Sequence, residues 1–231
     1  MMEHDENQMQ SASQCDQLAP VPISRIPGFG PNTHIMTPEG EIPVEWLATG
    51  DRLITRDHGA QPILWIGRTR LDAAALEIAP ETAPISIAKG ALGHGCPSHP
   101  TWLAASSRVL LSGAAVELYA GVDEALSEII HLRTPGQIDA TLSCHDLCYT
   151  HILLPMHETV EANGLWAETL HLDPVARFVL ADSLPPILLA DPDIAHAHRQ
   201  TARPCLAPWE VAAMRGRSDT SAAAELIRRV A

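Results

Sequence analysis

Basic side chains, regularly spaced cysteines and long apolar runs are scarce in this sequence, and each scarcity excludes a class of protein. Fifteen Lys and Arg stand against 28 Asp and Glu, for a net charge of −13. A chain this acidic repels the phosphate backbone of nucleic acids. No stretch of the sequence approaches the roughly 18 apolar residues of a membrane-spanning helix. We therefore expect neither a nucleic-acid partner nor a membrane span.

The five cysteines, at positions 15, 96, 144, 148 and 205, form no evenly spaced framework, so a disulfide scaffold is not predicted. The first 20 residues contain no Lys or Arg. They therefore lack the basic start and apolar middle of a cleavable signal peptide. We expect a disordered acidic head over residues 1–24, in a protein that is cytoplasmic or exported without an N-terminal signal peptide.

Short strand patterns separated by turn residues fill residues 31–67. An apolar strand at 33–37 is followed by a proline and glycine turn at 38–41, where proline presets φ and glycine accepts a positive φ. Further strand patterns lie at 42–47, 53–55 and 63–66, the first carrying Trp46 and the last Trp65. This spacing predicts an all-β domain with both tryptophans in its core, ligand stacking being the alternative.

Similar patterns continue along the chain. We expect strands at 84–88 and 128–132, a strand-turn-strand unit at 101–111, a short helix within 115–126, and a hairpin that pairs 148–154 with 159–162. Residues 68–84 are alanine-rich and predict a loop with a helical turn. The tail, residues 171–231, predicts short helices at 208–214 and 222–230, because proline or capping residues stand at their starts.

The opening pattern resembles a known family. Val44, Glu45, Gly50, Asp51 and Trp65, together with their intervening positions, are similar to the start of the Hint (Hedgehog/intein) domain in its bacterial form outside true inteins. The resemblance runs from about residue 28 to residue 169 and implies an all-β Hint-like domain over residues 25–170. It also implies autocatalytic peptide-bond rearrangement by an N–S or N–O acyl shift, without a cofactor, on the chain's own polypeptide or another protein.

Several family positions carry different residues here. Gly28 stands where the family has its cysteine nucleophile, Ser107 where it has a histidine, and Pro155 where it has an aspartate, while His157 is kept. Glu168 and Thr169 stand where true inteins end on His-Asn. The resemblance thus makes Gly28, Ser107, His157 and Thr169 the candidate catalytic positions. The losses predict an inactive, degenerate domain, since glycine has no side-chain atom that can attack.

Other interpretations stay open. Ser24 and Cys15 are alternative nucleophiles, and Ser106 and Ser107 are either turn residues or a nucleophile pair. A protein-binding or scaffold module on the same fold is the competing function.

A weaker hypothesis is a metal-dependent hydrolase built on a cluster of Cys and His residues, namely Cys144, His145, Cys148, His151 and His157. The spacing supplies only half of a zinc pattern, and residues 148 and 151 of a strand face opposite sides. No metal is therefore predicted.

Overall fold

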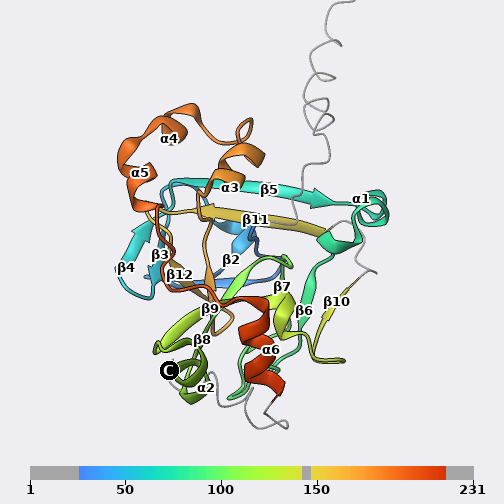
Figure 1. Cartoon of the computed structure of the whole chain (residues 1–231). Helices are drawn as coiled ribbons and strands as arrows, with labels where there is room; N and C mark the ends of the chain where they lie inside the picture. The colour runs from blue at the N-terminus through green and yellow to red at the C-terminus, as the bar shows by residue number, and fades with distance from the viewer. Residues whose placement is uncertain (1–25, 142–146, 217–231) are drawn as a thin grey trace, which may run out of the picture.

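Short antiparallel strands make up most of the computed structural model, which describes residues 26–141 and 147–216. Figure 1 shows them in chain order. The strands are β1 His34–Thr37, β2 Gly40–Pro43, β3 Arg52–Thr55, β4 Gly59–Pro62, β5 Trp65–Leu71, β6 Ile85–Ile87, β7 Thr101–Leu103, β8 Arg108–Ser112, β9 Glu124–Glu128, β10 Ile138–Ala140, β11 Leu147–Leu153, β12 Thr159–Ala162 and β13 Leu165–Glu168.

Helices are short and concentrated in the tail. They are α1 Ala73–Ile78, α2 Ala114–Ala120, α3 Pro174–Val179, α4 Pro186–Ala190, α5 Pro192–Ala197 and α6 Pro208–Gly216, with 3₁₀ turns η2 Val44–Trp46, η3 Pro80–Thr82 and η4 Ile129–Leu132. None of the helices in the described ranges has the length and apolar composition needed to span a bilayer.

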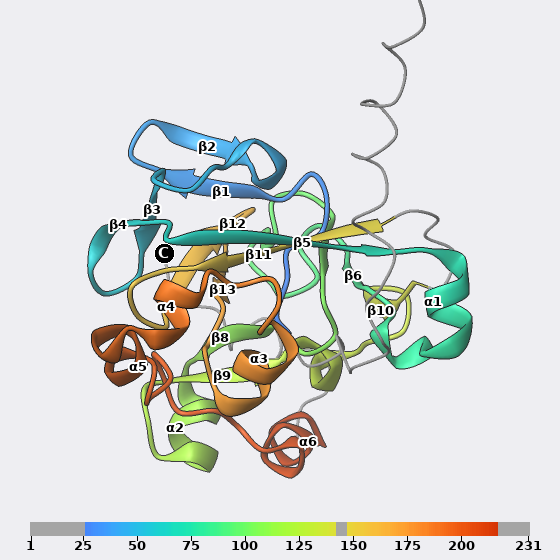
Figure 2. The same ribbon diagram turned by 90° about the horizontal axis from the view of Figure 1, so that it is seen from above.

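The strands form three groups. The main sheet has the order β2-β1-β12-β13-β8-β9, with β3 pairing β12 and β4. A smaller sheet has the order β10-β6-β7, and the long strands β5 and β11 pair from Trp65↔Leu153 to Leu71↔Leu147. Figure 2 shows this long pair crossing the molecule. Every strand pair is antiparallel, and the predicted all-β fold is confirmed.

The turn between β12 and β13 ties distant segments together. Asn163 and Gly164 both adopt positive φ, 49° and 81°, as a tight hairpin turn requires. The Asn163 side chain accepts a hydrogen bond from the backbone N–H of His34 (2.9 Å) and donates one to the hydroxyl of Thr101 (2.8 Å). The hairpin is thereby fixed to β1 and β7.

Two apolar clusters explain how the tail joins the domain. The main core includes Ile35 and Leu53 of the sheets together with Val211 of α6, and none of the three has any exposed surface. A second cluster joins Leu153 of β11 to Ala176 of α3 and to other residues of the tail. Figure 1 shows α3, α4 and α5 lying over the β5/β11 pair. The tail is therefore packed against the sheets through buried apolar side chains, which stabilise it by removal from water.

Several local predictions are wrong. The strand at 148–154 pairs with β5, and β12 takes β13 as its hairpin partner, because the Asn-Gly turn follows β12. The expected strand at 128–132 is the 3₁₀ turn η4, and the strand precedes it as β9.

Trp65 is buried as expected, but Trp46 is 77% exposed. The prediction for Trp46 failed because the 3₁₀ turn η2 turns only Val44 inward. The predicted acidic head and the helix at 222–230 lie outside the described residues.

Candidate functional site

The chain around Gly28 runs between two strands of the interior. Phe29 exchanges backbone hydrogen bonds with Thr150 of β11, at 2.9 and 2.8 Å, and Ala104 donates its N–H to the Gly28 carbonyl at 2.9 Å. Phe29 is 3% exposed. The Pro27–Gly28 peptide bond is therefore held in place from both sides.

Two polar side chains meet this peptide bond. The N–H of Gly28 donates to the Ser107 hydroxyl at 2.9 Å, and that hydroxyl donates to the Gly28 carbonyl at 3.2 Å. The Nδ1 of His151 lies 2.7 Å from the Pro27 carbonyl oxygen. The structure thus brings Gly28 and Ser107 together, as their family positions predict, and adds His151.

The protonation state of His151 follows from its partners. A carbonyl oxygen can only accept, so Nδ1 carries the proton and donates to Pro27. Nε2 then accepts from the Thr69 hydroxyl, 2.9 Å away on β5. Burial lowers the pKa of His151, opposed by the hydrogen bond to Pro27. His151 is thus a neutral imidazole with a fixed tautomer that polarises the Pro27 carbonyl.

A side chain at residue 28 would be tightly packed. A Cβ added to Gly28 would lie 3.0 Å from the Tyr149 Cβ and 3.1 Å from the His151 Cε1. These distances are shorter than the normal separation of packed carbon atoms. The arrangement can polarise the Pro27 carbonyl, but it holds no residue-28 atom that can attack it.

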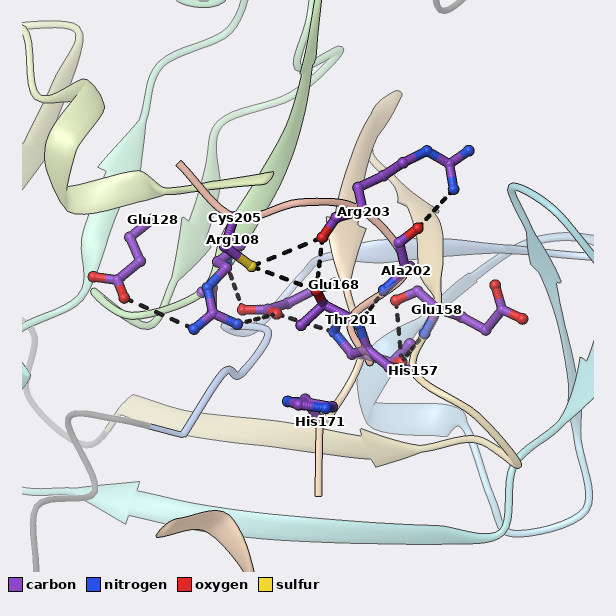
Figure 3. A network of polar contacts seen from close by, with 12 residues as sticks. Arg108, Glu128, His157, Glu158, Glu168, His171, Thr201, Ala202, Arg203 and Cys205 are labelled. Carbon is purple, nitrogen blue, oxygen red and sulfur yellow. Dashed lines mark hydrogen bonds and ion pairs between the residues drawn. The ribbon is translucent and has the colours of Figure 1, made fainter. Parts of the chain in front are cut away.

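His157 belongs to a second buried network, shown in Figure 3. Its Nδ1 accepts the backbone N–H of Ala202 at 2.8 Å, so its Nε2 carries the proton and donates to Glu168 Oε2 at 3.1 Å. Glu168 also accepts from the backbone N–H (2.8 Å) and guanidinium (3.1 Å) of Arg108. Both nitrogens of His157 are therefore engaged, one of them by the tail.

Thr169 forms hydrogen bonds between two neighbouring strands. Its hydroxyl donates to the Glu158 carbonyl at 3.1 Å and accepts from the Glu158 N–H at 3.2 Å. These bonds hold the start of β12 to the end of β13. Among the hydrogen bonds of the described residues, neither His157 nor Thr169 contacts the Pro27–Gly28 bond, so the candidate positions divide into two places.

A polar cleft of about 420 Å³ opens beside Ser107. Its wall contains the two neighbours of Ser107, Ser106 and Arg108, together with Glu128 and Asp173. The Oγ of Ser106 is buried without a hydrogen-bond partner. Ser106 therefore lines a different space from the one Ser107 faces, and the two do not form a matched nucleophile pair at the peptide bond.

The Cys and His residues proposed for a metal are only partly described. Residues 26–141 and 147–216 contain no group of three or more His, Cys, Asp or Glu side chains placed to hold a metal. Cys144 and His145 lie outside these ranges, as do Cys15 and Ser24. Both nitrogens of His151 and of His157 take part in hydrogen bonds.

Sequence reasoning missed His151 as a site residue and placed it only in the metal hypothesis. The available sequence signal was its place at every second position of a strand, between large apolar residues. Tyr149, His151 and Leu153 alternate onto one face of β11, and all are buried. A polar side chain in such a row needs an internal partner, which here is the Pro27 carbonyl.

Comparison with known proteins places the fold in a family. The Hint domain family model matches residues 27–174. The MchDnaB-1 intein is similar at 11% identity, with 61% of this chain and 98% of that chain covered and a TM-score of 0.39. The gp41-1 intein is similar at 9% identity, with coverages of 61% and 96% and a TM-score of 0.36. The search of curated proteins found no match. Because the family match spans more than half of the 231 residues, the chain belongs to the Hint domain family, a family of the autoprocessing and splicing type.

Proposed function

We propose that this protein is a degenerate Hint domain in which the Pro27–Gly28 bond does not rearrange. One observation carries the proposal. His151 contacts the Pro27 carbonyl, while the nucleophile position holds a glycine, where an added Cβ would lie 3.0 Å from Tyr149 and 3.1 Å from His151. The chain keeps the architecture of the reaction without its attacking atom.

The chemistry of the step shows why the loss matters. An acyl shift forms a bond from a side-chain sulfur or oxygen of residue 28 to the Pro27 carbonyl carbon, and breaks the bond from that carbon to the Gly28 nitrogen. The leaving nitrogen must gain a proton from a general acid. Ser107 accepts the Gly28 N–H, and so does not supply that proton in the observed arrangement.

The intact mass of the full-length protein tests this proposal. The mass is followed over days at pH 7, with and without dithiothreitol or hydroxylamine, alongside His151→Ala as a variant that lacks the polarising contact. We expect one constant mass in every sample. Thiol- or hydroxylamine-dependent cleavage after Pro27 that His151→Ala abolishes would show that an acyl intermediate forms and would overturn the proposal.

Cleavage at another position has a separate meaning in the same experiment. Fragments ending just before residue 15 or residue 24 would assign the reaction to Cys15 or Ser24, the alternative nucleophiles. The mass of each fragment identifies the broken bond. Those fragments would support the autoprocessing class and contradict its loss.

A protein-binding module on the same fold is the second candidate function. The observation that favours it is an extended piece of the tail bound along the edge of the main sheet, where Leu206 donates its N–H to Leu126 of β9 at 2.8 Å. The fold thus provides a binding edge that does not depend on the lost reaction.

A further inference from the structure

An extended segment of the tail, residues 201–206, is here called the strap. β9 is the outermost strand of the main sheet on its side. The N–H of Leu126 donates to the Pro204 carbonyl and the N–H of Leu206 donates to the Leu126 carbonyl, both at 2.8 Å, as a short parallel bridge between Leu126 and Cys205. These are the backbone contacts by which an added peptide extends a sheet.

Arg203 anchors the strap through charge. Its guanidinium donates to both carboxylate oxygens of Asp57, at 2.7 and 2.8 Å, and its Nε donates to Glu124 at 2.8 Å. Glu124 is also held by Arg56 at 2.7 Å. The Arg203 hydrogen bond lowers the pKa of Asp57, against the effect of burial. A bidentate arginine contact of this kind fixes the orientation of the bound segment and also strengthens its binding.

Among the remaining strap residues, some contact the domain and others face solvent. The Ala202 N–H reaches His157, and Leu206 is 8% exposed. Pro204 and Cys205 between the anchors are exposed. The main sheet therefore holds the strap through an arginine, a leucine three residues later and the backbone between them. A short linear peptide could supply the same three contacts.

We propose that the β9 edge, with Asp57 and Glu124, is a peptide-binding edge, and that the strap is its internal ligand. The partner is a protein that presents an extended Ala-Arg-x-x-Leu segment, which lies parallel to β9 in place of the strap. The carboxylates of Asp57 and Glu124 complement the charge of the arginine. The sequence of the strap, which lies after the family match at residues 27–174, defines the segment that the partner must present.

The strap also sets the affinity that a partner must have. A tethered segment competes at an effective concentration of about millimolar, so only a tight or locally concentrated partner displaces it. This inference deepens the second proposed function and does not depend on whether Pro27–Gly28 rearranges. Peptide titration and the intact-mass experiment therefore fail independently.

The test is fluorescence polarisation of a labelled peptide with the sequence of residues 199–207, carrying the equivalent of C205S, titrated with full-length proteins. The Arg203→Ala protein loses the internal anchor but keeps Asp57 and Glu124. Arg199→Ala is the matched control, an exposed arginine of the same tail for which no side-chain ion pair is found among the described residues. We expect Arg203→Ala to bind the peptide at least tenfold more tightly than the wild-type and Arg199→Ala proteins.

Two further arms decide the contacts. In the first arm, the peptide carries alanine at the position equivalent to Arg203. In the second, the protein carries both Arg203→Ala and Asp57→Asn. Each change should weaken binding at least tenfold relative to the arginine peptide with the Arg203→Ala protein. Equal binding by Arg203→Ala and wild type, or equal binding of the arginine and alanine peptides, would overturn the proposed peptide-binding edge. A wild-type dimer that the peptide dissociates would mean that the occupant is the strap of a second copy, and would overturn the assignment to a partner protein.

Discussion

The imidazole of His151 donates to the carbonyl of Pro27 at 2.7 Å although 124 positions separate the two residues. The contact holds the first described residues of the domain against the long strand β11. It polarises the carbonyl of the bond that precedes Gly28, the position where the family resemblance predicts a nucleophile. The contribution of this contact to stability can be measured by mutation.

Gly28→Ala is expected to lower the free energy of unfolding by about 1–3 kcal/mol, the usual cost of overpacking. The added Cβ meets Tyr149 at 3.0 Å and His151 at 3.1 Å. Urea unfolding gives the value. Gly216→Ala is the control, because a Cβ there has no neighbour within 4 Å. Equal effects of the two substitutions would contradict the tight contact at Gly28.

Thr69→Val should cost about 1–2 kcal/mol of unfolding free energy, since it leaves Nε2 of the buried His151 without its hydrogen-bond donor. Thr69→Ser keeps the hydroxyl and should retain most of the stability. Denaturant titration of both variants separates the hydrogen bond from the packing of the γ-methyl group. Similar losses for Val and Ser would show that the hydroxyl is not what stabilises the imidazole.

Glu168→Gln should destabilise the protein by about 3 kcal/mol, because it removes the negative charge that compensates the guanidinium of Arg108. Glu168 is 2% exposed and accepts from Arg108 and His157. Asp139→Asn, in the exposed pair with Arg133, is the matched control and should leave stability unchanged. Thermal unfolding at pH 7 distinguishes the buried network from the surface pair.

Acidification below pH 6.5 should reduce stability through His198. Burial lowers its pKa from 6.5 to about 4, so the unfolded chain binds the proton first and is favoured as pH falls. This contribution is complete above pH 6.5 and is lost towards pH 4, with a magnitude of about 3 kcal/mol. Burial raises the pKa of Glu158, which acts in the opposite direction.

A comparison with His198→Gln isolates the histidine term in that pH dependence. The wild-type free energy of unfolding should fall more steeply between pH 6.5 and 4 than that of the variant. The opposing effect of Glu158 is present in both proteins and cancels in the difference. Parallel pH profiles would show that His198 is not the group responsible.

Cys96 should resist alkylation in the native protein. Burial and the charge of Glu161 raise its pKa to about 11, which leaves roughly one thiolate in a thousand at pH 8. Cys205 is exposed and should react with iodoacetamide before Cys96. Peptide mapping of native and urea-unfolded protein measures the order, and rapid native labelling of Cys96 would contradict it.

How far the sequence predicts this structure depends on the range of the interactions. Strands such as β1 and β7 follow from local alternation and turn residues, and the spaced family positions indicate the domain. The partner of β11 does not, because β5 lies far away in the chain and pairing is decided by packing. Trp46 has the same strand-like surroundings as Trp65, yet a proline at position 43 starts a 3₁₀ turn that exposes it.

The candidate site shows the same division. Gly28 and Ser107 were identified by family position, and the structure brings them within hydrogen-bond distance. The role of His151 could not be predicted, because the sequence does not show which chain segment lies against its face of β11. His157 and Thr169 were predicted at the same site, but they lie in contacts with Glu168, Ala202 and Glu158. Their catalytic roles and the domain limits at residues 25–170 and 171–231 stay predictions.

The hairpin turn at Asn163 and Gly164 bears on how the protein ages. In a mobile Asn-Gly sequence, the glycine nitrogen attacks the asparagine side-chain carbonyl carbon, and the amide is lost as ammonia. Here the oxygen of that amide is held by His34 and its nitrogen by Thr101, so turning the side chain towards Gly164 would break both hydrogen bonds. The folded chain should therefore keep this asparagine intact during long storage, and deamidation there should report unfolding.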